Sequence, residues 1–234
     1  MVSIMKRFAH LVVLMSLITL TACNDGVISF PTPEPAQFRV VNTTVNVPTL
    51  RVTIDSSSYV DVSRGSVSPL VDVPAGRRVR FGFGSQTRNY LDSVFFTFGG
   101  STRVLLFILG DTTGKTTNSS ISYLRAIQDT VLPLGTANSF VRFTHIGSAT
   151  NFIPYEVEVW VNGKAKLTQE FFEAGKSSAQ YTQLTPGTYT FEIREYGTTT
   201  VLATLPNVEL RAGTSYMLYS YDADVPGELQ LGIF

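Results

Sequence analysis

Few residues in this 234-residue chain have types and spacings that could do chemistry. The first candidate is "VLLFILGDTTGKTT" at residues 104–117, where Gly-Lys-Thr follows an apolar stretch, as in nucleotide-binding loops. Such a loop needs four residues between its two glycines and then a helix, whose free N–H groups hold the phosphates. Only three residues separate Gly110 from Gly114, and "TNSSISY" after Thr116 has little helix propensity. We therefore expect a polar loop between two strands, and no nucleotide.

Catalytic and metal-binding side chains are also scarce. Beyond residue 22 the chain holds one cysteine, Cys23, and one histidine, His145, and no G-x-S-x-G motif occurs. We therefore expect a protein that is not an enzyme, without metal or cofactor. The alternative is a hydrolase in which His145 acts with a serine and an aspartate. Residues 222–228, "DADVPGE", do not fit an EF-hand because Pro226 and Ile233 occupy ligand positions, which leaves a looser calcium site open.

One aromatic residue is a candidate for binding. The segment "VEVWV" at 157–161 alternates, with valines on one face and Glu158 and Trp160 on the other. Trp160 therefore shares the polar face with Glu156 and Glu158, where it could stack on a sugar ring or anchor a protein partner. We favour the simpler alternative, in which Trp160 packs against a neighbouring strand.

The first 22 residues read as an export signal. Lys6 and Arg7 precede an apolar stretch at 11–20, which is shorter than the roughly 18 residues that span a bilayer. The stretch ends in "LTAC", residues 20–23, which resembles the bacterial lipoprotein lipobox. The resemblance implies that Cys23 becomes the mature N-terminus and carries a diacylglyceryl thioether, usually with a third acyl chain.

Two or three acyl chains anchor a protein stably, so we expect Cys23 to hold the chain on the bacterial cell envelope, at the outer membrane. The folded part then faces either the periplasm or the cell surface. Residues 23–36 contain three prolines and are expected to form an extended tether. After residue 22 the chain carries 16 basic and 18 acidic side chains, which argues against nucleic acid as a partner.

Strand-like alternation recurs along the rest of the chain, as in "RVRFGF" (78–83) and "TYTFEI" (188–193), and turn residues separate the segments. The two halves also match each other in order. The matched pairs are 38–42 with 141–145, 50–55 with 157–162, 72–84 with 183–195, 98–109 with 210–221, and 120–127 with 227–234. We therefore predict an all-β fold of two tandem antiparallel immunoglobulin-like sandwiches, each with about seven strands. The modules span 37–130 and 139–234, joined by a linker at 131–138.

The second half also resembles the bacterial family called domain of unknown function 4397, through "VRFTH", "VEVWVNG", "LTPGTYTFEIRE" and "VELRAGTSYMLYSY". It departs from the family after His145, where "IGSATNFIP" replaces a Ser-Pro-Asp-Ala-Pro run. The resemblance covers 139–234, and 37–128 more weakly. It implies tandem β-sandwich modules on exported or lipid-anchored bacterial proteins, and no activity.

Together these features predict a lipid-anchored envelope protein that acts as a non-enzymatic binding or structural module. Its expected partners are the membrane and an envelope protein or polysaccharide. Two alternatives remain open: a hydrolase using His145, and an accessory subunit of a secretion or pilus machine. Asn42 matches His145 in the repeat, which favours a shared structural position for a polar residue.

Overall fold

The computed structural model describes residues 33–86, 89–110, 122–128, 137–147, 156–167, 172, 177–178, 180–225 and 227–234. The predicted signal segment, Cys23, the Gly-Lys-Thr sequence and most of the predicted linker lie outside these ranges. The chain divides into two units, 1–32 and 33–234, and the description below concerns the second. Every element in the described ranges is a strand, so the prediction of an all-β fold is confirmed. Within these ranges no helix is long and apolar enough to cross a membrane.

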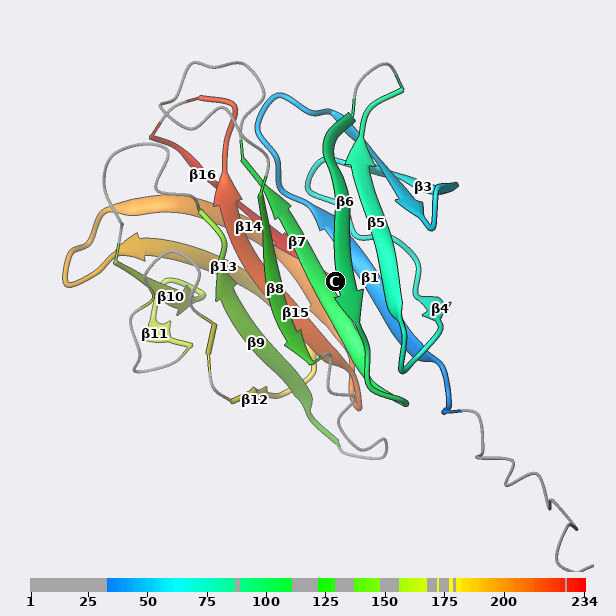
Figure 1. Ribbon diagram of the computed structural model, residues 1–234. Helices are drawn as coiled ribbons and strands as arrows, with labels where there is room; N and C mark the ends of the chain where they lie inside the picture. The colour runs from blue at the N-terminus through cyan, green and yellow to red at the C-terminus, as the bar shows by residue number, and fades with distance from the viewer. Residues whose placement is uncertain are drawn as a thin grey trace, which may run out of the picture. The chain divides into compact units, whose positions relative to one another are not determined.

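Sixteen strands make up the described part of the chain, eight in each half, where the sequence predicts about seven (Figure 1). The strands of the first half are β1 (Ala36–Asn42), β2 (Thr49–Ile54), β3 (Ser57–Ser63), β4 (Val71–Val73), β5 (Arg78–Gly84), β6 (Asn89–Thr97), β7 (Arg103–Leu109) and β8 (Ser122–Gln128). Those of the second half are β9 (Ser139–His145), β10 (Val157–Val161), β11 (Ala165–Lys166), β12 (Thr182–Leu184), β13 (Gly187–Glu195), β14 (Val201–Leu210), β15 (Ser215–Asp222) and β16 (Leu229–Ile233).

The strands form four sheets of four strands each, and the pairing order repeats between the halves. We call β4-β1-β7-β8 and β12-β9-β15-β16 the inner sheets, and β3-β2-β5-β6 and β11-β10-β13-β14 the outer sheets. Each inner sheet has one parallel pair, β1 with β7 and β9 with β15, and its other pairs are antiparallel. Residues 38–42 and 141–145, matched by sequence, lie in β1 and β9, which hold equivalent places.

Two of the three apolar clusters join an inner sheet to the outer sheet of the same half. In the first half Phe38 of β1 meets Phe81 of β5 edge to face, with ring centroids 4.8 Å apart. In the second half Phe143 of β9 meets Phe172 in the same way, also at 4.8 Å. These clusters require strands with one apolar face, which the alternating pattern of "RVRFGF" supplies through Val79, Phe81 and Phe83.

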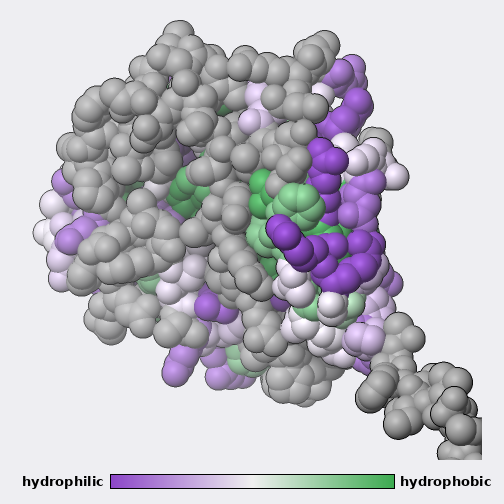
Figure 2. Space-filling model, viewed as in Figure 1, coloured by the Kyte–Doolittle hydropathy of each residue, from purple (hydrophilic) through white to green (hydrophobic). Residues whose placement is uncertain are grey.

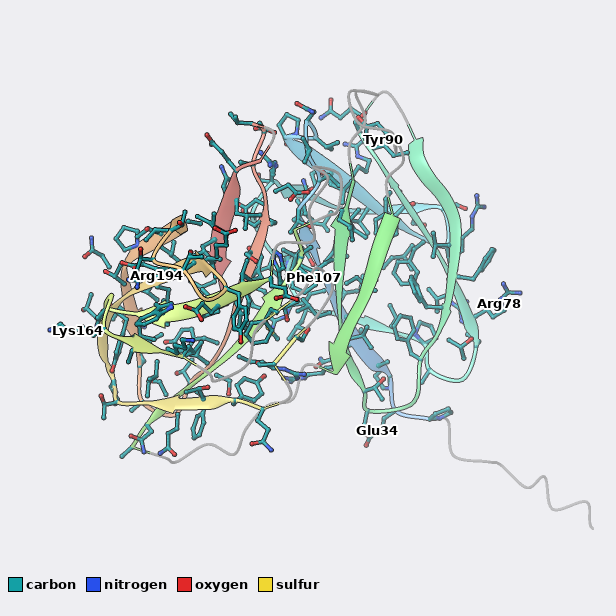
Figure 3. All side chains as sticks on the ribbon, turned by 90° about the vertical axis from the view of Figure 1, so that its left-hand side faces the viewer. Glu34, Arg78, Tyr90, Phe107, Lys164 and Arg194 are labelled. Atoms are coloured by element: carbon teal, nitrogen blue, oxygen red, sulfur yellow. The ribbon has the colours of Figure 1, made fainter. Side chains whose placement is uncertain are left out.

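The third cluster joins the two inner sheets to each other. Leu105 and Phe107 of β7 pack there with Met217 and Tyr219 of β15, and Phe107 lies between the halves in Figure 3. On β7 the alternate residues, Leu106 and Ile108, point the other way into the first cluster. Strand β7 is therefore buried on both faces, which explains the unbroken apolar stretch "VLLFIL".

The third cluster uses matching positions of the two repeats. Phe107 and Tyr219 are equivalent in the sequence alignment and touch each other, with ring centroids 5.4 Å apart. Leu105 and Met217 are also equivalent and belong to the same cluster. The contact therefore has the form of a two-fold interface, in which the same patch from each partner meets itself.

We expect Phe107→Ala to lower the free energy of unfolding by about 3–5 kcal/mol, because it leaves a cavity between the inner sheets. Phe95→Ala is the matched control: Phe95 is 45% exposed, and its contact with Arg78 is worth about 1 kcal/mol or less. Denaturant unfolding of both variants checks this. Equal losses in the free energy of unfolding in the two variants would contradict the burial of β7 on both of its faces.

Candidate functional site

The structure brings two of the three predicted binding residues, Glu158 and Trp160, into contact. Trp160 donates a hydrogen bond from Nε1 to Glu158 Oε1 at 2.7 Å, and the Arg194 guanidinium lies 4.2 Å from the centroid of its ring. Arg194 comes from β13, which pairs with β10, so Trp160 packs across strands and is half-buried. Glu156 is exposed, and its backbone carbonyl accepts a hydrogen bond from the Tyr196 amide at 2.9 Å.

Glu158 differs from the expectation of a solvated polar face, since it is only 2% exposed. Its Oε2 lies 2.5 Å from Lys166 Nζ of β11, the short strand that pairs with β10. Burial raises the pKa of Glu158, but hydrogen bonds from Lys166 and Trp160 outweigh burial, and the net pKa lies below its ordinary value. Alternation sets the face of a residue, and here the long side chain of Lys166 shields that face from water.

The lowered pKa of Glu158 makes a pH-dependent contribution to stability. It is present above the unfolded pKa of about 4.3 and is lost as pH falls through the lower folded pKa. We therefore expect Glu158→Gln to be less stable than wild type at pH 7, with the difference in free energy of unfolding narrowing toward pH 3. Glu209→Gln, on a side chain 67% exposed, should show no such narrowing. A difference that stayed constant from pH 7 to pH 3 would show that the Glu158 charge is not held by these partners.

His145 lies beside a serine, as the hydrolase alternative requires. Its Nδ1 is 2.6 Å from Ser220 Oγ, because β9 and β15 are parallel and place the two residues in register. His145 is 2% exposed and Ser220 is fully buried, however, whereas a catalytic serine must reach its substrate. The pair as placed here is a buried polar contact between two strands.

Asn42, at the matching position of the first repeat, is also buried and holds the loop after β1. Its Nδ2 donates to the carbonyls of Val47 and Val62 at 3.1 and 3.0 Å, and its Oδ1 accepts from the Thr44 amide at 3.1 Å. Buried polar groups need such partners. Strands β1 and β9 thus each end in a buried polar residue, Asn42 in β1 and His145 in β9.

The acidic loop after β15 contacts an arginine of the first half. Arg64, which follows β3, places Nη1 2.6 Å from Asp224 Oδ2 and donates from Nη2 to the Asp222 carbonyl at 2.5 Å. The Asn46 amide also faces Asp224 Oδ1, at 3.3 Å. Asp224 is therefore neutralised by Arg64, which disfavours it as a ligand for calcium. Arg64 joins the two halves instead.

A cavity of about 490 Å³ opens where these residues meet. It is lined from the first half by Asn46, Val47, Pro48, Ser63 and Arg64, and from the second by Tyr221, Asp224 and Gln230. Tyr221 lies so close to Gly65, whose φ is +70°, that a Cβ there would overlap its hydroxyl. Burial raises the pKa of the Tyr221 phenol, and Asp224 raises it further against the opposing effect of Arg64, so the phenol stays neutral at physiological pH.

A second cavity, of about 320 Å³, adjoins the first at Pro48. It is lined by Pro48, Thr49, Arg51, Asp61, Ser85 and Gln86. Arg51 and Asp61 face each other on β2 and β3, with Nε–Oδ1 and Nη2–Oδ2 distances of 2.9 and 3.0 Å. Hydrophilic residues also cover the side of the molecule near β3, β5 and β6 (Figure 2). We call the two cavities together the polar groove.

Sequence reasoning missed the polar groove because its residues come from separate strand ends, between 46 and 230. The one signal in the sequence is the acidic segment at 222–228, whose carboxylates leave a loose calcium site open. Its partner, Arg64, lies 158 positions before Asp222 and carries no motif. Only the contact between the halves brings the two together.

No family model matches the chain, and no curated protein matches its sequence. Among solved structures, one similar chain is described as a "putative adhesin" from Bacteroides ovatus. It shares 10% sequence identity with a TM-score of 0.24, over 86% of this chain and 92% of that one. This likeness is too distant to carry an argument about fold or function.

Proposed function

We propose that this protein is a lipid-anchored, non-enzymatic binding protein of the bacterial cell envelope, held at the outer membrane through Cys23. Its proposed partners are the membrane and an envelope polysaccharide or protein. The observation that carries the binding role is the polar groove, whose larger cavity of about 490 Å³ has the size of small-molecule sites. We further propose that 37–130 and 139–234 are immunoglobulin-like modules of the family called domain of unknown function 4397.

Two observations favour binding over hydrolysis. The His145–Ser220 pair is buried, so neither side chain reaches a substrate in this structure. Each aspartate of the groove forms an ion pair with an arginine, so its carboxylate faces a guanidinium rather than a position where it would activate a water. The repeated strand pairing of the two halves supports the proposal of tandem modules.

The lipid anchor is tested by Cys23→Ala. Without the thiol no thioether can form, so we expect the variant to leave the membrane fraction and to lose incorporation of labelled fatty acid. Ser29→Ala, in the predicted tether, is the control and should behave as wild type. A Cys23→Ala protein that stayed in the membrane fraction would overturn the anchor.

Protease treatment of intact cells then distinguishes the two faces of the outer membrane. Cleavage of the wild-type protein in intact cells means that it is displayed at the surface. Protection until the outer membrane is permeabilised means that it faces the periplasm. Either result fits an anchored binding protein, and each selects a different set of partners to screen.

A further inference from the structure

We propose that the polar groove binds an uncharged polysaccharide, with consecutive sugar units in its two cavities. This inference rests on the proposed binding function and names its ligand class. The two cavities share Pro48 as a common wall, so they are neighbouring parts of one surface. Their volumes of about 490 and 320 Å³ both lie within the usual size of small-molecule sites.

The cavities offer the same chemical groups twice. The first holds the Arg64–Asp224 pair with Ser63 and Gln230, and the second holds the Arg51–Asp61 pair with Ser85 and Gln86. Each set therefore combines a guanidinium, a carboxylate, a hydroxyl and a side-chain amide. This arrangement suits a ligand of repeating units, because each unit presents the same groups to the protein.

The charges of the groove favour an uncharged ligand. Each arginine is already paired with an aspartate, at 2.6 Å for Arg64 and 2.9 Å for Arg51. A phosphate or carboxylate would meet Asp224 or Asp61, and a cation would meet a guanidinium. A sugar hydroxyl is both donor and acceptor, so it can bridge an Arg–Asp pair without separating it.

The carboxylates of Asp224 and Asp61 can still accept hydrogen bonds from such hydroxyls. Asp224 is 59% exposed and Asp61 is 39% exposed, and a carboxylate accepts about four hydrogen bonds. A protein partner is less suited to this surface, because protein interfaces are centred on buried aromatic or arginine anchors entering deep pockets. The aromatic ring of the groove, Tyr221, is 7% exposed and offers little area for such an anchor.

The test is titration calorimetry on the full lipoprotein in detergent micelles. The probes are hexasaccharides of glucose, mannose, galactose and N-acetylglucosamine, with a galacturonate hexasaccharide as the charged comparison. We expect at least one neutral probe to bind, and to bind more tightly than galacturonate. The corresponding monosaccharide should bind about tenfold more weakly, because it fills one cavity. Absence of binding by all four neutral probes, or tighter binding of galacturonate, would overturn the proposal.

Variants then place the binding in the groove. Gln230→Ala and Gln86→Ala change exposed side chains, so the fold should survive, as thermal unfolding will show. Each should weaken hexasaccharide binding by about tenfold, the loss of one or two hydrogen bonds. Gln183→Ala, an exposed glutamine that lines neither cavity, is the matched control. Unchanged affinity in both groove variants would place the binding elsewhere and overturn the proposal.

The calorimetry can refute the polysaccharide proposal without bearing on the lipid anchor. Calorimetry uses purified protein and does not depend on where the protein resides in the cell. If Cys23→Ala leaves the membrane and the wild-type protein binds none of the probes, the lipid-anchor proposal stands and the polysaccharide proposal fails. If the wild-type protein binds a neutral probe and Cys23→Ala stays in the membrane, the polysaccharide proposal stands and the lipid-anchor proposal fails.

Discussion

The apolar contact between the two inner sheets is the constraint on which the rest of the structure depends. Phe107 and Tyr219 meet in it, and Tyr219 also donates a hydrogen bond to the Gly65 carbonyl at 2.7 Å. Burial in this contact raises the pKa of the Tyr219 phenol, which therefore remains a donor throughout the physiological range. The described part of 33–234 forms one compact unit for this reason, since each half covers an apolar face of the other.

The larger cavity of the polar groove follows from the same contact. Arg64 belongs to the first half and Asp224 to the second, so the larger cavity has walls from both. Neither half contains that cavity alone. The contact between the halves thus creates a cavity that has no equivalent within either half. A search for motifs inside one half therefore misses the pairing of Arg64 with Asp224.

Much of the fold could be predicted from the sequence, because alternation in a strand depends only on local geometry. The segments at 78–83 and 157–161 lie in β5 and β10, and the matched repeats lie on equivalent strands. The environment of Glu158 was not predictable, since it depends on Lys166 and on a cross-strand contact. The polar groove was not predictable either, since the pairing of Arg64 with Asp224 requires the packing of two inner sheets. The alternation of residues in a strand predicts to which face of the sheet a side chain points. The contacts between strands and sheets determine which residues cover that face.

The parallel pairing of β1 with β7 has a mechanical consequence. The chain enters β1 at Ala36, near Glu34 at the lower end of Figure 3, and the groove begins at Asn46, beyond the other end of that strand. A pull on the chain ahead of β1, resisted at the far end of β7, therefore runs along β1. Its hydrogen bonds with β7, spread over six paired positions, then bear the load together in shear rather than opening one after another. Forced detachment of such a strand is governed by the rate of unfolding, so this pairing sets how long the fold withstands a pull on its N-terminal end.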